Sequence, residues 1–148
     1  MTTVTASNPQ ELRKSIRSGN LIRPTSGLAP GYVQANLAIL PKDKAFDFLL
    51  FCQRNPKPCP VIEVIEPGEV EANVTAPGSD IRTDISKYRV YEQGKLTDEL
   101  NDLTDIWNED YVSFLLGCSF SFESALMQNR IRLPHFEKGT NVSMFITD

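Results

Sequence analysis

The chain has 148 residues, of which 41% are hydrophobic, and this is enough for one compact domain with its own core. Its net charge is −4 with both signs interspersed, which disfavours a nucleic-acid partner, because binding to a phosphate backbone needs clustered Lys and Arg. No apolar run approaches the ~18 residues of a membrane span, and the N-terminus lacks the pattern of a signal peptide. We therefore expect a cytoplasmic protein with no membrane and no nucleic-acid partner.

The first predicted element is a helix that begins after Asn8 and ends before Gly19. Asn8 can cap the helix, and Pro9 suits its first position because proline lacks the backbone N–H that this position leaves unpaired. Leu12 and Ile16 give the helix one narrow apolar stripe, so it should lie on the surface of a larger body.

A strand, a helix and a second strand are predicted next. Residues 32–40 alternate at first and then become continuously apolar, as in a strand that enters the interior of a sheet. Residues 42–54 have helical periodicity and are apolar almost all round, which predicts a helix buried on two sides. Residues 61–65 are rich in β-branched side chains and predict a short strand. Together they suggest a βαβ-like unit over residues 21–66, followed by the remaining α/β portion, 67–148.

The C-terminal half is predicted to hold a hairpin, two helices and two short closing strands. The hairpin covers residues 87–96 and turns at Gln93-Gly94. Residues 111–116 place apolar side chains at i, i+1, i+4 and i+5, which predicts a helix. Residues 131–136 and 142–147 resemble short strands.

The segment GCSFSFE, from Gly117 to Glu123, is the most informative stretch of the chain. It brings a glycine, a thiol, two hydroxyls and a carboxylate together between two apolar helical patterns, as a binding site on packed elements would. The alternative is that Gly117 ends one helix and that Ser119 or Ser121 caps the next, which would run to Gln128. Spacing alone leaves both interpretations open.

The loop PGSDIRTD offers a second cluster of polar side chains. Arg82 provides a planar fork that binds carboxylates, and Asp80 and Asp84 are possible bases beside it. The alternative is an internal Asp–Arg pair on a solvated turn, which is the more common outcome.

Cysteine and histidine give weaker signals. Cys118 is a possible nucleophile, although a small buried cysteine is the more common role. Such a nucleophile needs a base, and His135, the one histidine, is the available candidate. The three cysteines, Cys52, Cys59 and Cys118, fit reduced thiols better than a disulfide framework. Because no CxxC or HExxH spacing occurs, we expect no metal site and assign no cofactor.

Four long segments of the chain resemble one known family. They are residues 31–41, 46–64, 76–91 and 110–126, and the resemblance extends over residues 21 to 144. The family comprises hydro-lyases, once catalogued as a domain of unknown function, and includes D-glutamate cyclases. This resemblance makes residues 1–148 a single hydro-lyase region of about half the family's usual length. It implies an α/β fold, a three-layer sandwich with an interleaved smaller two-layer α+β subdomain, incomplete in this chain.

The resemblance also implies a lyase acting on a small amino or carboxylic acid. In the cyclase members, D-glutamate loses water and closes to 5-oxo-D-proline. On the matched motifs, the candidate catalytic residues can move a proton or stabilise an oxyanion: Asp80, Asp84, Glu123 and Ser119. The candidate substrate-binding residues offer positive charge or hydrogen bonds: Arg82, Thr83, Asn36, Gln34, Cys118 and Ser121.

The short length of the chain relative to the family leads to one expectation and leaves two rival interpretations. A complementing C-terminal segment or a second copy of the chain would cover apolar surface left exposed. The rival interpretations are a carboxylate-binding module without turnover, or a fragment whose role is assembly with another chain.

Overall fold

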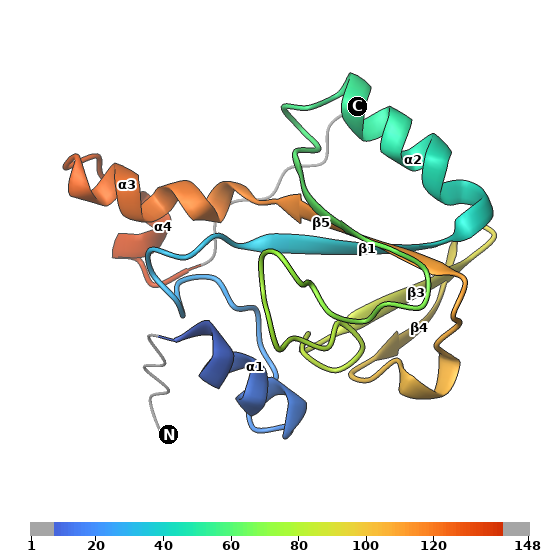
Figure 1. The fold of residues 1–148 in the computed structure, drawn as a ribbon. Coiled ribbons are helices and arrows are strands. Elements are labelled where there is room, and N and C mark those ends of the chain that lie inside the picture. The colour runs from blue at the N-terminus through green and yellow to red at the C-terminus, as the bar shows by residue number, and fades with distance from the viewer. Residues whose placement is uncertain (1–7, 141–148) are drawn as a thin grey trace.

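A three-stranded sheet forms the centre of the computed structural model, which describes residues 8–140. Its strands lie in the order β1 (Ala35–Pro41), β5 (Tyr111–Gly117) and β2 (Val61–Ile65), and β5 runs antiparallel to both neighbours. Helix α2 (Lys42–Arg54) connects β1 to β2 and packs against the sheet, as Figure 1 shows. The chain is therefore a mixed α/β protein, in agreement with the predicted class.

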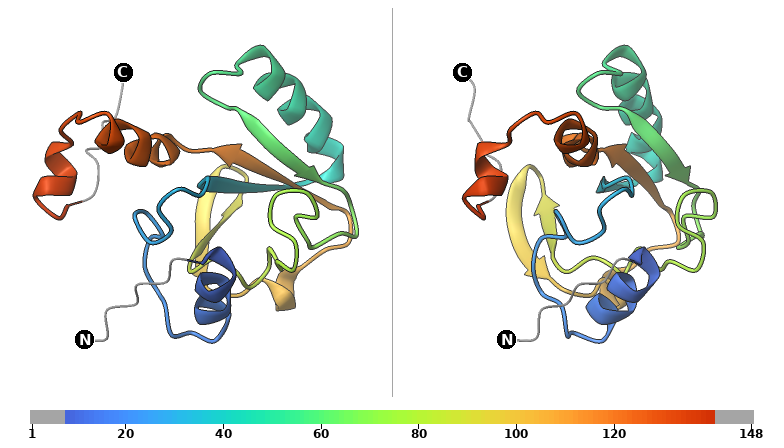
Figure 2. Two further views of the ribbon diagram at one scale, coloured as in Figure 1. Left: turned by 60° about the vertical axis from the view of Figure 1, so that its left-hand side comes forward. Right: turned by 90° about the vertical axis from the view of Figure 1, so that its left-hand side faces the viewer.

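A separate hairpin and several short helices complete the described fold. The hairpin consists of β3 (Tyr88–Glu92) and β4 (Lys95–Leu100). The remaining helical elements are α1 (Pro9–Arg17), η1 (Thr104–Ile106), η2 (Ser119–Phe122), α3 (Glu123–Gln128) and α4 (Pro134–Glu137). Figures 1 and 2 show α2 on one side of the sheet and the hairpin and α1 on the other, while α3 and α4 extend beyond the end of β5.

Strand β5 separates two small hydrophobic cores. On the α2 side, Val112 and Phe114 pack with Ala45 of the helix. On the opposite side, Leu115 packs against a cluster that includes Ile65 and Ile81. Because both faces of β5 are covered by apolar groups, its sequence is apolar at almost every position.

This double burial explains why the helix predicted over residues 111–116 was wrong. A strand covered on both faces has no polar face, so its apolar residues also fall at the i, i+1, i+4 and i+5 positions of a helix. The pairing of Phe114 with Ala38 on one side and Val64 on the other fixes the extended conformation. Gly117 consequently ends a strand and caps no helix.

The predicted strand, helix and strand of the N-terminal half are present, although their arrangement has one unexpected feature. Because β1 and β2 each run antiparallel to β5, they run in the same direction as one another, but β5 lies between them. The expected burial of the connecting helix on two sides was wrong. Of the residues of α2, Ala45 and Cys52 are buried, whereas Phe46 is 72% exposed and Phe51 is 52% exposed.

Local signals predicted the N-terminal helix and the hairpin correctly. The side chain of Asn8 accepts a hydrogen bond from the backbone N–H of Gln10, which caps α1. The hairpin turns at Gln93 and Gly94, both with positive φ, as in the turn whose twist matches the flanking strands.

The two closing strands had different outcomes. The segment 131–136 was wrongly predicted as a strand, because Pro134 begins the short helix α4, where proline suits the first position. The segment 142–147 lies outside the described residues.

Candidate functional site

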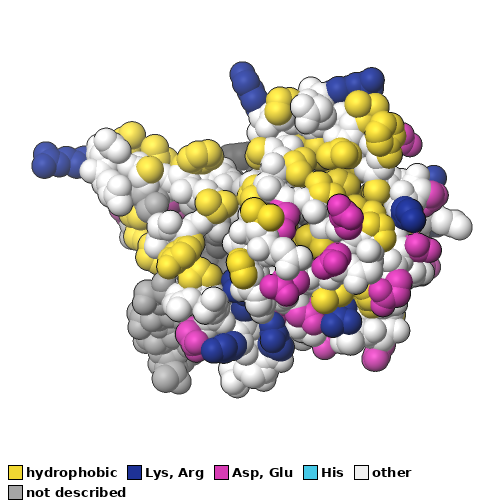
Figure 3. Space-filling model, in the orientation of Figure 1, with side chains coloured by type: hydrophobic (Ala, Val, Ile, Leu, Met, Phe, Trp, Pro, Cys, Tyr) yellow, Lys and Arg dark blue, Asp and Glu magenta, His cyan; other side chains and the backbone are white. Residues whose placement is uncertain are grey.

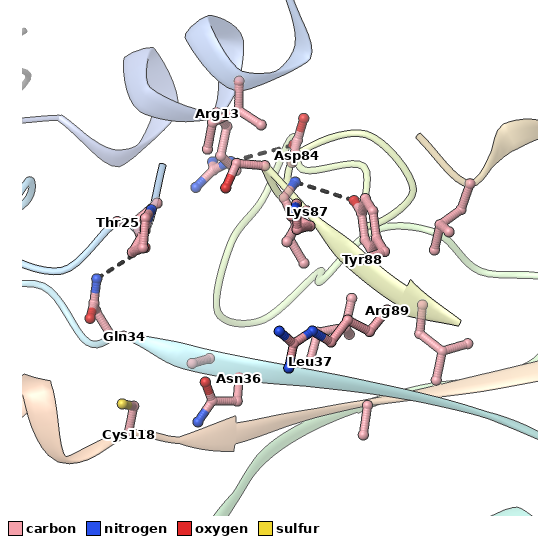
Figure 4. Close-up of a pocket in the computed structure, with 18 of the residues that line it drawn as sticks. Arg13, Thr25, Gln34, Asn36, Leu37, Asp84, Lys87, Tyr88, Arg89 and Cys118 are labelled. Atoms are coloured by element: carbon pink, nitrogen blue, oxygen red, sulfur yellow. Dashed lines mark hydrogen bonds and ion pairs between the residues drawn. The ribbon is translucent and has the colours of Figure 1, made fainter. Parts of the chain in front are cut away.

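A cavity of about 940 Å³ runs along β1 and is bounded by β3 and α1. Four of the predicted site residues line it, although they come from distant parts of the chain: Gln34, Asn36, Asp84 and Cys118. Figure 4 shows these four side chains around the start of β1 and the loop before β3. The other predicted residues lie elsewhere, namely Asp80, Arg82, Thr83, Ser119, Ser121 and Glu123.

Residues 117–123 are held against the start of β1 by hydrogen bonds. The Ser121 hydroxyl accepts a bond from the backbone N–H of Gln34 at 2.9 Å, and the Cys118 N–H donates to the Gln34 carbonyl at 3.2 Å. The helix-cap interpretation of this segment was wrong, since neither Ser119 nor Ser121 caps a described helix with its side chain. Ser121 instead holds the segment that contains Cys118 against the residue before β1. The amide of Cys118 is already bonded, so it is not available to an oxyanion.

Asn36 and Cys118 are two of the cavity-lining polar residues whose side chains make no hydrogen bond to other described residues. Neither makes a side-chain hydrogen bond within residues 8–140. Gln34, in contrast, donates its side-chain amide to Thr25 at 3.1 Å, as Figure 4 shows. Asn36 and Cys118 therefore provide an amide and a thiol for a ligand.

The loop that contains Asp80 and Arg82 forms an internal ion pair, which was the alternative interpretation of its sequence. Arg82 donates from Nε and Nη2 to the two oxygens of Asp80, at 2.9 and 2.7 Å. Asp84 is buried and accepts from Nε and Nη2 of Arg17, both at 2.8 Å, and from the N–H of Asp80. Thr83 lies beside them, 3.4 Å from Asp84. These contacts tie the loop to α1.

The Asp80–Arg82 pair should make stability depend on pH in acid. The hydrogen bonds from Arg82 lower the pKa of Asp80 in the folded chain. A lowered folded-state pKa means that this stabilisation is present above the unfolded value, about 3.9, and is lost as pH falls through the folded value. We expect the free energy of unfolding to fall less between pH 6 and pH 3 in Asp80→Asn than in the wild-type chain. Asp47→Asn, an exposed change on α2, is the matched control; equal slopes for the Asp80→Asn and wild-type chains would contradict the assignment.

Glu123 pairs with His135 and not with the cavity. His135 Nε2 lies 2.7 Å from Glu123 Oε1, and both side chains are mostly buried. The pair joins α3 to α4. His135 is therefore engaged by a carboxylate, and the structure does not bring it together with Cys118 as a nucleophile–base pair.

Two cations that the sequence did not predict as site residues line the cavity: Lys87, immediately before β3, and Arg89 on β3. Lys87 and Arg89 both pair with Glu99 of β4, through Nζ at 2.9 Å and Nε at 3.0 Å. Figure 4 shows the guanidinium of Arg89 over β1, near Leu37 and Asn36. A regular hairpin turning at Gln93-Gly94 would place Arg89 opposite Asp98, and an irregularity between Val90 and Tyr91 shifts the register so that Arg89 pairs with Glu99.

The described residues contain no group of side chains suited to a metal ion. Within the same part of the chain, no helix is long and apolar enough to cross a membrane.

Fold and cavity together define an α/β protein with an open cleft that presents cationic and amide groups. Residues 112–148 match the family model described as D-glutamate cyclase. The chain is 53% identical over 148 residues to a protein of Geobacillus kaustophilus named as a putative hydro-lyase, covering 100% of the chain and 56% of that relative. A relative with the same kind of name in Bacillus subtilis is 55% identical over 140 residues, which cover 95% of the chain and 54% of that relative. Another, in Rubrobacter xylanophilus, is 55% identical over 138 residues, which cover 93% of the chain and 53% of that relative. The chain belongs to this family of hydro-lyases and D-glutamate cyclases, and it spans about half the length of the curated relatives it matches.

Proposed function

We propose that this chain forms the substrate-binding part of a hydro-lyase that acts on a small amino or carboxylic acid. The candidate reaction is the closure of D-glutamate to 5-oxo-D-proline. The observation that carries the proposal is the convergence of Asn36, Cys118 and Arg89, from three separate segments, on one cavity. Family membership supports the reaction class. We further propose that the complete fold is a three-layer sandwich with an interleaved two-layer subdomain.

The reaction defines what the cavity must supply. The amine nitrogen attacks the γ-carboxyl carbon, a C–N bond forms, and a C–O bond breaks as one oxygen leaves as water. The ammonium nitrogen loses two protons, the departing carboxylate oxygen takes up both and leaves as water, and a negative charge develops on the remaining oxygen in the tetrahedral intermediate. The site therefore needs a cation for the α-carboxylate, a proton-transfer group and hydrogen-bond donors for the oxyanion.

We assign the carboxylate anchor to Arg89. Arg82 has the right chemistry, but its fork is closed on Asp80, whereas Arg89 uses Nε for Glu99 and lies over β1 in the cavity. An arginine fork binds a carboxylate through charge and two hydrogen bonds at once. Asn36 is the proposed donor beside the anchor.

For proton transfer we retain Asp84, because it is the proposed carboxylate that lines the cavity. Ser119 and Glu123 do not line the cavity, and Glu123 is paired with His135, so we assign neither residue a role at this substrate site.

The test is turnover of D-glutamate, followed as formation of 5-oxo-D-proline, with L-glutamate as a stereochemical comparison. We expect Arg89→Gln to raise KM by about tenfold, which corresponds to about 1.4 kcal/mol of lost substrate binding. Arg82→Gln is the matched control, since its fork serves Asp80, and its KM should stay near the wild-type value. Equal effects of the two substitutions would contradict the anchor assignment.

A binding module without turnover is the second candidate, and half-length coverage of the relatives favours testing it. D-glutamate would then raise the melting temperature without forming product, because a ligand that binds the native state stabilises it. The assay should use both the chain as it stands and the chain joined to the unmatched portion of the Bacillus subtilis relative. Absence of both turnover and thermal stabilisation in both forms would overturn the proposed function.

A further inference from the structure

The outer edge of β1 is unpaired within residues 8–140. The Gln34 carbonyl accepts from Cys118, and the Lys42 N–H donates to Asp110, so even-numbered residues of this segment direct their backbone groups towards β5. In an antiparallel pair, alternate residues direct their N–H and C=O to opposite sides. The backbone groups of Ala35, Leu37 and Ile39 consequently point away from the sheet, and none of the described residues bonds to them.

This edge lacks the features that protect exposed strands from pairing. Natural edges are blunted by charged side chains, proline or bulges. β1 reads ANLAILP, without a charged residue and with its proline at the end, whereas β4, an edge of the hairpin, reads KLTDEL. The β1–β5 register also contains no bulge. The sequence of β1 is therefore typical of an interior strand.

Apolar surface continues from this edge onto α2. Phe46 is 72% exposed and Leu49 is 37% exposed on the helix. Figure 3 shows hydrophobic side chains gathered over α2 and in the strip below it. The cavity that follows β1 also includes Phe48 of α2 and every residue of β1 in its lining. A volume of about 940 Å³ is far larger than a molecule the size of glutamate requires.

The length of the relatives indicates what covers this surface. The chain accounts for 53–56% of the length of the relatives it matches, so a portion nearly as long has no counterpart here. We propose that a strand from this unmatched portion pairs with the free edge of β1 and extends the sheet order beyond β1. Its neighbouring apolar residues cover Phe46 and Leu49. Main-chain hydrogen bonds would supply affinity, as in other cases of strand addition.

This pairing would also reduce the cavity to a size that suits a small substrate. A strand beside β1 occupies the outer part of the cavity and leaves the inner part near Asn36, Cys118 and Arg89. The inference does not depend on the identity of the substrate, because it rests on the unpaired edge and on the length of the relatives.

The test compares the chain alone with the chain joined in one polypeptide to the unmatched portion of the Bacillus subtilis relative. Hydrogen exchange of the backbone amides of Ala35, Leu37 and Ile39 is the readout. We expect exchange at these amides to be at least ~10-fold slower in the joined protein, because exchange reports whether an amide is bonded and protected. Unchanged exchange would overturn the proposal.

A second experiment uses co-expression of the two parts as separate chains. Ile39→Pro removes an outward N–H and should abolish co-purification, while the β1–β5 pairing survives because proline is tolerated where an edge N–H faces outward. Ile39→Val, which keeps the N–H, is the matched control and should co-purify. Ala35→Pro repeats the test at the exposed start of the strand. Failure of the wild-type chain to co-purify, or a dimer of this chain through β1 that excludes the second part, would overturn the proposal.

Discussion

Replacing Phe114 with alanine should lower the free energy of unfolding by about 3–5 kcal/mol, the cost of truncating a large buried aromatic side chain. Phe114 is 1% exposed at the centre of β5, the strand that both other strands of the sheet require. Its ring also meets Phe48 of α2 edge to face, with ring centres 5.0 Å apart. The substitution therefore weakens the sheet and the attachment of α2 together.

Urea unfolding followed by far-UV circular dichroism measures this effect. Phe46→Ala is the matched control, because the same atoms are removed from a side chain that is 72% exposed. Its effect should stay within about 0.5 kcal/mol, as for most surface substitutions. A loss below about 1 kcal/mol for Phe114→Ala would mean that β5 does not lie between two covered faces.

The second large effect is expected at Asp84. Asp84→Ala should lower the free energy of unfolding by about 2 kcal/mol, because hydrogen bonds to a charged group contribute about 1.5–3 kcal/mol and the partly buried N–H of Asp80 would lose its acceptor. The expected loss of stability lies near the lower end of this range because the Arg17 side chain is 45% exposed, so water can solvate it once Asp84 is removed.

Asp84→Asn separates charge from hydrogen bonding in the same measurement. The asparagine oxygen can still accept from the Asp80 N–H, so this variant should lose less stability than Asp84→Ala. Glu99→Gln, which breaks the exposed pair with Arg89 on the hairpin, is the control and should leave the unfolding midpoint unchanged. An unfolding midpoint for Asp84→Ala equal to that of the wild-type chain would contradict the role of Asp84 in attaching the loop of residues 77–84 to α1.

Elements with strong local signals were predicted well. The Asn8 cap, the proline that follows it and the two positive-φ residues at Gln93-Gly94 act within a few residues of the chain, so sequence alone reveals them. Helix α2 was also predicted with its observed ends at Lys42 and Arg54.

Elements whose conformation depends on distant partners were predicted poorly. The helix expected over residues 111–116 is strand β5, because pairing with both β1 and β2 outweighs a spacing that is compatible with either conformation. The expected burial of α2 on two sides likewise failed, since periodicity shows how apolar a helix is but not what covers it.

The candidate site also contains residues that were predicted from sequence and residues whose role depends on the tertiary structure. Asn36, Cys118 and Asp84 were predicted as site residues from their chemistry and motifs, and all three line the cavity. Arg89 was not predicted, and the bond to Asp80 makes Arg82 less suitable for its predicted role as a carboxylate anchor. Both differences arise from which way a charged side chain points, and a sequence does not record this direction.

The sequence by itself determined the family, the α/β class, the local ends of α1 and α2 and the chemistry available to the site. The tertiary structure decided the central position of β5, the pairing of Asp84 with Arg17 and the attachment of the GCSFSFE segment to β1 through Ser121 and Gln34. The physical reason is the range of the interactions concerned. Caps and turns satisfy backbone groups of neighbouring residues, whereas sheet pairing, ion pairs and hydrogen bonds between segments join residues far apart, such as Arg17 with Asp84 and Gln34 with Ser121.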